Sequence, residues 1–336
     1  MRILSFPEYP LPIVCGGIEL RCLKTTEALS RIGLAVRLLD YYDYLSEYDV
    51  LHIFGNPPSI FELRVKMSAE HKFVLSCVCA AKKNPGIKEY AHRLLSRFAA
   101  LAHQKNDLMK LRYVFKSADA VICLNQLEAN YAINHYGAIA EKVHIVGNAV
   151  DDIFFSADPN PFVEKYGFGD FVLFTGNICQ RKNPLLLAEA LNIEKCKGVF
   201  IGNITKDEPR YVDSFRRIIS ESPNLVWIDG LNRDDPLLSS AYAASSVFAL
   251  PSTSETQPQS ALEAMAARKP VVLGDFAYAY QYPFCESVRT KIQKRAILQA
   301  IKKAKSRRHA VSGLDARHSW SFVAEEIARI YDGLFV

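Results

Sequence analysis

The chain has 336 residues, of which 49% are apolar and 23% charged. This is the composition of a globular protein, and the length exceeds that of one compact core, so we expect two domains. The net charge of +5, from 41 basic and 36 acidic residues, excludes a broadly basic nucleic-acid-binding protein. No apolar run has membrane-spanning length and no signal-peptide pattern opens the chain, so we expect a cytoplasmic protein.

Short apolar runs alternate with segments of helical period, which predicts βα units around parallel sheets. In the first half we expect strands at 2–6, 35–39, 50–54, 72–78, 120–124 and 142–146, and helices at 18–31, 87–116 and 126–136. The pattern lapses over 147–169, a stretch rich in Asp, Asn, Pro and Gly. We therefore place a domain boundary in this stretch.

The alternation then resumes to the end of the chain. We expect strands at 171–175, 199–201, 225–228, 247–250 and 270–273, and helices at 184–191, 210–220, 235–243, 259–267, 291–305 and 318–334. The predicted fold class is α/β, with two doubly wound parallel sheets. Ligands of such sheets bind at the carboxyl ends of the strands.

The eight cysteines include no CxxC pair. Cys77 and Cys79 lie two residues apart in an apolar run, which places both on one face of a strand. This spacing favours buried thiols in a reducing cytosol over a zinc site or a disulfide framework.

The first informative loop follows the strand at 247–250. It begins at Pro251 and contains Glu255, and Pro258 is placed to open a helix that contains Glu263. A helix N-terminus offers free N–H groups to a phosphate, and nearby carboxylates accept hydrogen bonds from sugar hydroxyls. The combination predicts a site for a sugar nucleotide.

A second loop follows the strand at 171–175. It begins at Gly176 and leads to a helix opened by Asn183 and Pro184, with Arg181 and Lys182 just before that helix. Cations at a helix N-terminus are disfavoured by the helix dipole unless an anion binds there. Arginine and lysine at this place therefore predict a diphosphate site.

These motifs resemble those of the retaining family-four glycosyltransferases (glycosyl transferases group 1), which have the GT-B fold. Glu255 and Glu263 match the family's pair of glutamates, and the segments 264–266 and 270–272 match its Ala-Met-Ala and Pro-Val-Val. The resemblance implies two Rossmann-like domains that face a central cleft. It divides the chain into an acceptor-side domain at 1–155, a nucleotide-sugar-binding domain at 156–315 and a helix at 316–336 that returns to the first domain.

The resemblance also implies roles for single residues. Glu255 would contact the transferred sugar and Glu263 the ribose hydroxyls, while Arg181 and Lys182 would neutralise the departing diphosphate. The remaining donor-binding residues it implies are Gly16, Gly17, Gly176, Asn177, Leu231, Thr256, Gln257 and Gln259. Asn177 stands where the family has an arginine, and we expect Arg181 to compensate. The alternative for Glu263 is that it caps or solvates an amphipathic helix.

The acceptor side departs from the family. A histidine near the reacting centre is replaced by Cys77 or Cys79. Our acceptor-side candidates are His52, Cys79 and Lys82. A single histidine at a strand end is commonly a core residue, so this alternative stays open for His52.

The activity implied is retaining transfer of a sugar from a nucleoside-diphosphate sugar to a hydroxyl of a glycan, a lipid-linked acceptor or another polysaccharide precursor. No acidic pair follows a strand in the way a metal-binding pair would, so we expect no metal and no cofactor beyond the donor. One alternative is a catalytically degenerate protein that binds a nucleotide sugar or glycan. A second is a glycosyltransferase acting on a nucleic acid base, which the lack of a nucleic-acid-binding module disfavours.

Two stretches hold the surplus positive charge. The segment 82–116 has nine Lys/Arg against two acids, and 289–308 has nine Lys/Arg and no acid. A charge run of this kind is commonly a solvated helix face. The alternative for 82–116 is peripheral contact with an anionic membrane at its inner face, or with an acidic acceptor.

Overall fold

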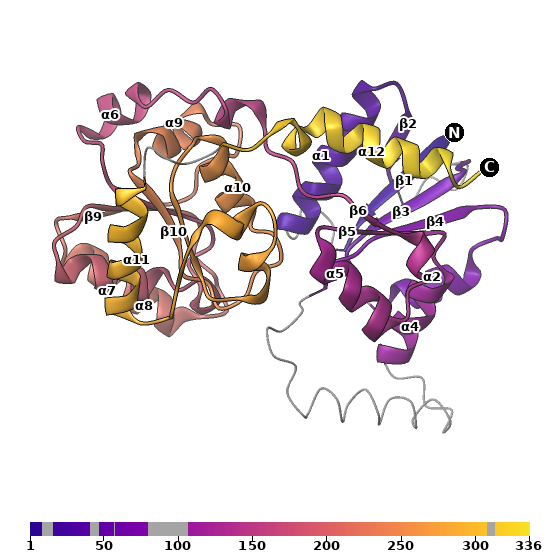
Figure 1. The fold of residues 1–336 in the computed structure, drawn as a ribbon, viewed down its shortest axis with the longest axis horizontal. Helices are drawn as coiled ribbons and strands as arrows, with labels where there is room; N and C mark the ends of the chain where they lie inside the picture. The colour runs from indigo at the N-terminus through magenta and orange to yellow at the C-terminus, as the bar shows by residue number, and fades with distance from the viewer. Residues whose placement is uncertain (9–15, 41–46, 57, 80–106, 308–312) are drawn as a thin grey trace. The chain divides into compact units, whose positions relative to one another are not determined.

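The computed structural model describes residues 1–8, 16–40, 47–56, 58–79, 107–307 and 313–336 (Figure 1). The chain divides into two compact units. The first comprises Met1–Ala149 and Ala316–Val336, and the second comprises Val150–Asp315. The C-terminal helix therefore belongs to the same unit as the N-terminal half of the chain.

The first unit is built on a six-stranded parallel sheet with the order β2-β1-β3-β4-β5-β6. Its strands are β1 (Arg2–Pro7), β2 (Ala35–Leu38), β3 (Val50–Phe54), β4 (Lys72–Ser76), β5 (Ala120–Cys123) and β6 (Val143–Ile145). Its helices are α1 (Gly17–Arg31), α2 (Ile60–Lys66), α4 (Asp107–Ser117), α5 (Gln126–Tyr131) and α12 (Trp320–Asp332).

Both faces of this sheet are covered by helices, because successive side chains of a strand point to opposite faces. Val50 of β3 packs in the cluster formed with α1 and α12, whereas its neighbour Leu51 packs in the cluster formed with α2, α4 and α5 (Figure 1). The central strands are consequently apolar runs without alternation, as in parallel sheets that are buried on both sides.

The second unit has its own six-stranded parallel sheet, with the order β12-β11-β10-β7-β8-β9. Its strands are β7 (Val172–Thr175), β8 (Gly198–Ile201), β9 (Leu225–Ile228), β10 (Val247–Leu250), β11 (Val271–Gly274) and β12 (Val288–Thr290). Its helices are α6 (Asn160–Tyr166), α7 (Pro184–Ile193), α8 (Pro209–Ser220), α9 (Pro236–Ala244), α10 (Gln259–Ala266) and α11 (Lys294–Ser306). Helix α7 contacts α8 and α11, while α9 contacts α6 and α10. The two sheets confirm the predicted fold class.

Some elements differ from the prediction. The sequence analysis placed no element at α2, α6 or β12, and these are short segments with few buried side chains; α2 and α6, for example, bury only Ile60 and Phe162. The helix expected at 87–116 is described only from Asp107 onward, as α4. Helix α10 begins at Gln259, with Pro258 as its N-cap residue rather than in its first turn.

The carboxyl ends of β7 and β8 approach each other at two glycines. Gly202 has a φ of +153°, and a Cβ atom there would lie 2.0 Å from the carbonyl oxygen of Gly176. Gly202 also donates its N–H to Ile228 of β9 at 3.1 Å. Only glycine satisfies both the backbone angle and the contact, so this residue sets how closely the loop after β7 lies to its neighbour.

We expect Gly202→Ala to destabilise the second unit by about 3–5 kcal/mol, because the methyl group collides with backbone that cannot move freely. The matched control is Gly33→Ala, where φ is +91° but no atom lies within 4 Å of the added Cβ. That change carries only the backbone strain, about 1–2 kcal/mol. Thermal unfolding of both variants measures the difference; equal shifts would mean that the contact with Gly176 is unimportant.

The C-terminal helix α12 is joined to the sheet of the first unit through a buried histidine. The ring nitrogens of His52 lie 2.6 Å from the hydroxyl of Tyr331 and 2.8 Å from the hydroxyl of Ser76. His52 and Tyr331 are both 0% exposed. Burial, and secondarily the charge of Arg21, lowers the pKa of His52 well below its ordinary value.

This arrangement predicts a pH-dependent stability. Folded His52 stays neutral in mild acid, whereas in the unfolded chain it gains a proton below about pH 6.5. Its contribution is therefore present above pH 6.5 and falls, by about 1.4 kcal/mol per pH unit, as the pH drops towards the folded pKa. Urea unfolding of the wild type and of His52→Gln between pH 5 and 8 tests this. The stability difference between them should shrink below pH 6.5, and a constant difference would contradict it.

Candidate functional site

The loop between β7 and α7 brings two cations to the carboxyl edge of the second sheet. Gly176 follows β7 with a φ of +137°, and a Cβ there would lie 3.1 Å from both Cδ and Nζ of Lys182. A short 3-10 turn, Gln180–Lys182, leads to Asn183, which is left-handed with a φ of 56°, and Pro184 then begins α7. The lysine side chain therefore folds back over the glycine that ends the strand.

The loop after β10 supplies the carboxylate that faces these cations. Arg181 Nη1 donates to Glu255 Oε1 at 2.7 Å and to the carbonyl oxygen of Ser254 at 2.6 Å. Lys182 Nζ lies 3.2 Å from the same Oε1 atom. The side chain of Arg181 is 48% exposed, but those of Lys182 and Glu255 are only 15% and 11% exposed. The three residues predicted to carry the chemistry thus form one ion cluster.

Further hydrogen bonds hold the two loops together. Thr253 donates its N–H to the carbonyl oxygen of Arg181 at 2.9 Å, and the Asn183 amide donates to that of Pro251 at 2.9 Å. The hydroxyl of Ser252 is buried and lies 3.2 Å from Glu255 Oε1. Because these bonds are made largely to backbone, the positions of Arg181 and Glu255 do not depend on the ion pair alone.

The other predicted donor-binding residues of this unit lie at the same strand ends. Asn177, next to Gly176, is exposed, and Thr256 and Gln259 are half-buried on either side of Gln257, which is buried. Leu231 is half-buried and follows Gly230, where a Cβ atom would lie 1.9 Å from Oδ1 of Asn203.

Glu263, on α10, takes part in a largely buried polar network. Its Oε2 accepts a hydrogen bond from Tyr242 at 2.7 Å, and its Oε1 lies 2.7 Å from Nη2 of Arg233. Arg233 Nε donates in turn to Asp151 at 3.1 Å. Glu263 is 4% exposed, so it does not solvate a helix face.

Electrostatics fix the charges in this network. Burial lowers the pKa of Arg233, but the carboxylates of Glu263 and Asp151 outweigh burial and raise its pKa overall. Burial and the charge of Glu263 raise the pKa of Tyr242 well above its ordinary value, so its hydroxyl remains a donor. The sequence analysis did not identify Arg233, since one arginine in a polar loop carries no pattern of its own.

In the first unit, the two predicted glycines open α1. Gly16 is the N-cap residue, and its N–H donates to the carboxylate of Glu19 at 3.0 Å. A Cβ at Gly16 would lie 2.9 Å from that carboxylate, whereas Gly17 has open space around it. The sequence analysis did not identify Glu19 as the residue that accepts the N–H of Gly16.

The acceptor-side candidates have different surroundings. His52 is fully buried, and both of its ring nitrogens form hydrogen bonds. It is therefore a core residue, which is the alternative to acceptor contact that the sequence analysis left open. Cys79 is 1% exposed. Lys82, and the larger part of the basic segment 82–116, lie outside the described residues.

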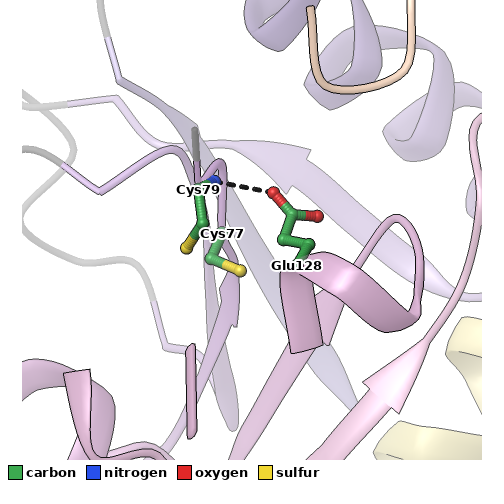
Figure 2. A group of neighbouring side chains, drawn as sticks. All are labelled: Cys77, Cys79 and Glu128. Carbon is green, nitrogen blue, oxygen red and sulfur yellow. Dashed lines mark hydrogen bonds between the residues drawn. The ribbon is translucent and has the colours of Figure 1, made fainter. Parts of the chain in front are cut away.

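Cys79 belongs to a buried group with Cys77 and Glu128 (Figure 2). One ligand atom from each of the three lies within 4.8 Å of the others, a spacing that suits a metal ion. The carboxylate of Glu128 also accepts N–H groups from Cys79 and Leu124, both at 2.6 Å. Burial raises its pKa to about 7, although these two donors and Arg21 lower it. Glu128 therefore caps the segments that follow β4 and β5.

Comparisons with known proteins find a family that resembles part of this chain. Residues 169–283 match the family model described as glycosyl transferases group 1. Among curated protein sequences, none matches the chain. No helix among the described residues is both long and apolar enough to cross a bilayer.

Solved structures share the fold over the whole chain. HepE from Anabaena, in complex with UDP, has a TM-score of 0.70 at 17% identity and covers 99% of this chain and 100% of its own. Sucrose-phosphate synthase from Thermosynechococcus elongatus has a TM-score of 0.72 at 15% identity, with 100% and 99% covered. The catalytic domain of starch synthase IV from Arabidopsis thaliana, bound to ADP and acarbose, has a TM-score of 0.69 at 12% identity, with 99% of each chain covered.

The family match covers the strands β7 to β11, the loops that carry the ion cluster, and Glu263 with its partners Tyr242 and Arg233. The fold of both units is the one found in these glycosyltransferases. Residues 169–283 thus match the glycosyl transferases group 1 model, and the chain as a whole has the GT-B fold.

Proposed function

We propose that the protein is a retaining, metal-independent glycosyltransferase that moves a sugar from a nucleoside-diphosphate sugar to an acceptor hydroxyl. The observation that carries this proposal is the cluster of Arg181, Lys182 and Glu255 at the ends of β7 and β10. The UDP and ADP bound in the related structures support a nucleotide donor.

The charge of the cluster fits a diphosphate. Two cations face one carboxylate, which leaves one positive charge before any ligand is counted. A diphosphate that enters adds charge-assisted hydrogen bonds to the guanidinium fork and the ammonium group. Asn177, in place of the family arginine, supplies an uncharged donor, so Arg181 carries the bidentate contact in our proposal.

Glu255 changes partners as the donor binds. In the structure its Oε1 is shared by Arg181, Lys182 and Ser252. When the diphosphate draws the two cations to itself, the carboxylate is released to accept hydrogen bonds from hydroxyls of the sugar. Glu255 would thus form ion pairs in the empty site and contact the sugar once the donor is bound.

The transfer step needs no protein base in this proposal. The acceptor oxygen forms a bond to the anomeric carbon on the face that the diphosphate leaves, and the bond from that carbon to the phosphate oxygen breaks. The acceptor proton passes to the departing phosphate oxygen. The contribution of the protein is the stabilisation of negative charge on the leaving group by Lys182 and Arg181.

Glu263 would hold the ribose hydroxyls of the donor. A carboxylate has more acceptor positions than the contacts to Tyr242 and Arg233 occupy. These two contacts orient it. Gly16, Gly17, Leu231, Thr256, Gln257 and Gln259 complete the proposed donor contacts.

The acceptor belongs to the first unit in this proposal, and its class is a glycan or a lipid-linked polysaccharide precursor. Cytoplasmic location and peripheral contact with an anionic membrane through 82–116 remain predictions from the sequence. Action on a nucleic acid base has no further support.

We expect Lys182→Ala to lower kcat by about 10²–10³-fold with a smaller change in KM, because its charge acts mainly on the leaving group. Lys165→Ala is the control, since Lys165 is an exposed lysine on α6. Donor consumption is measured by mass spectrometry, after a screen of UDP-, GDP-, ADP- and dTDP-sugars has identified the donor. Unchanged turnover in Lys182→Ala would remove this loop from the active site.

The stereochemistry and the metal requirement give a separate test. We expect an α-linked donor sugar to yield an α-linked product in proton NMR, and activity to survive treatment with EDTA. A β-linked product would refute the retaining mechanism, and loss of activity restored by a divalent cation would refute metal independence. Donor binding without hydrolysis or transfer would instead favour a degenerate nucleotide-sugar-binding protein.

A further inference from the structure

A cavity of the second unit lies apart from the loops discussed so far. It is formed between α11 and β12, the edge strand of the sheet, and has a volume of about 410 Å³. The proposed donor loops follow β10 and β7, which are the third and fourth strands from this edge. The cavity is therefore separate from the proposed donor loops. Helix α11, which forms one of its walls, is labelled in Figure 1.

The lining of this cavity is positively charged. Arg289 and Lys291 come from β12 and the residue after it, and Lys303 and Arg307 come from α11 and its C-cap. None of the described residues that line the cavity is acidic. These four cations are part of the basic run at 289–308, whose role the sequence left open between a solvated helix face and a binding surface.

Some cations of α11 and of the residues beside it pair with acids, whereas others line the cavity. Lys294 pairs with Glu189 at 2.9 Å and Lys302 pairs with Glu194 at 2.7 Å, both on the α7 side. Lys291, Lys303 and Arg307 have no acidic partner among the residues that the structure describes. Solubility alone does not explain why some of these cations are paired with acids while others line a cavity without an acidic partner in the described part of the chain.

The face of α11 that lines the cavity carries small side chains, which would let a ligand come close to the helix. Ala296 and Ala300, one turn apart, lie between the cations, and Lys303 and Arg307 continue the same face. Small side chains at the base let a ligand approach the helix while the longer cations surround it.

Arg289 is oriented before any ligand binds. Its guanidinium lies over the ring of Tyr280, 4.6 Å from the ring centre, and its Nη1 donates to the carbonyl oxygen of Cys285 at 3.0 Å. A guanidinium has five N–H donors, so others remain for a ligand. Such fixed donors reduce the entropy that binding would cost.

We propose that this cavity binds a phosphate group with more than one negative charge, either in a free pyrophosphate-like anion or in the headgroup of a lipid. A phosphate offers several charged oxygens to cations that arrive from different directions, which a single carboxylate does not. The proposal is independent of the proposed transferase activity, because it concerns other strands and other residues.

The experiment compares two double variants that lose the same charge from the same helix. Lys303→Ala/Arg307→Ala removes cations that line the cavity, and Lys302→Ala/Lys305→Ala removes cations that do not. Both are made in a Lys182→Ala background, so that the proposed donor loop contributes less to anion binding. Thermal unfolding first checks that the variants remain folded.

Pyrophosphate is then titrated calorimetrically into each protein, and sedimentation is measured with phosphatidylcholine vesicles that contain either phosphatidic acid or phosphatidylglycerol. We expect the cavity variant to bind roughly tenfold more weakly and the control variant about as well as its parent. Loss confined to pyrophosphate identifies a free anion, and loss confined to phosphatidic acid vesicles identifies a lipid headgroup. Equal losses in the two variants, or no binding by the parent, would overturn the proposal.

Discussion

The carboxylate of Glu255 connects two loops that are distant in the chain, since it lies 74 residues from its partner Arg181. The loop before α7 is unfavourable by itself, since Arg181 and Lys182 stand at the start of a helix, where the dipole repels cations. The carboxylate offsets this repulsion, and the backbone bonds from Thr253 and Asn183 keep the loops in contact. The result is a pair of cations whose charge is partly balanced by one carboxylate. In our proposal a diphosphate takes the place of that carboxylate. The proposed chemistry depends on this exchange.

The polar network around Glu263 is a second constraint on this region. Glu263, Arg233, Tyr242 and Asp151 form a buried network in which each charge has an opposite partner. Removing one member would leave an uncompensated charge in a site of low polarity, which is costly. Such a network fixes α10 against α9, and therefore fixes the loop that carries Glu255. It gives Glu263 a structural role alongside the ribose contact that we propose for it.

The first unit uses buried polar groups differently. His52 joins the sheet to α12 through Tyr331, and Glu128 caps the segments after β4 and β5. In both cases hydrogen-bonding capacity is used within the fold. The family histidine is absent, and neither His52 nor Cys79 presents an exposed side chain in its place. A mechanism in which the departing phosphate takes the acceptor proton is consistent with these surroundings.

The sequence by itself determined the fold class, because apolar runs that alternate with segments of helical period are local patterns. It also singled out Arg181, Lys182 and Glu255 as candidate residues, whereas the ion pairs that join them were decided by the tertiary structure. It did not reveal α2, α6 or β12, whose few buried residues leave no periodic signal. Only the tertiary structure decided that His52 belongs to the core and that Arg233 pairs with Glu263. It also distinguished Lys294 and Lys302, which pair with acids, from Lys303, which lines the cavity. These outcomes depend on contacts between segments distant in sequence, and a residue's partner across such a distance is fixed by packing rather than by its neighbours in the chain.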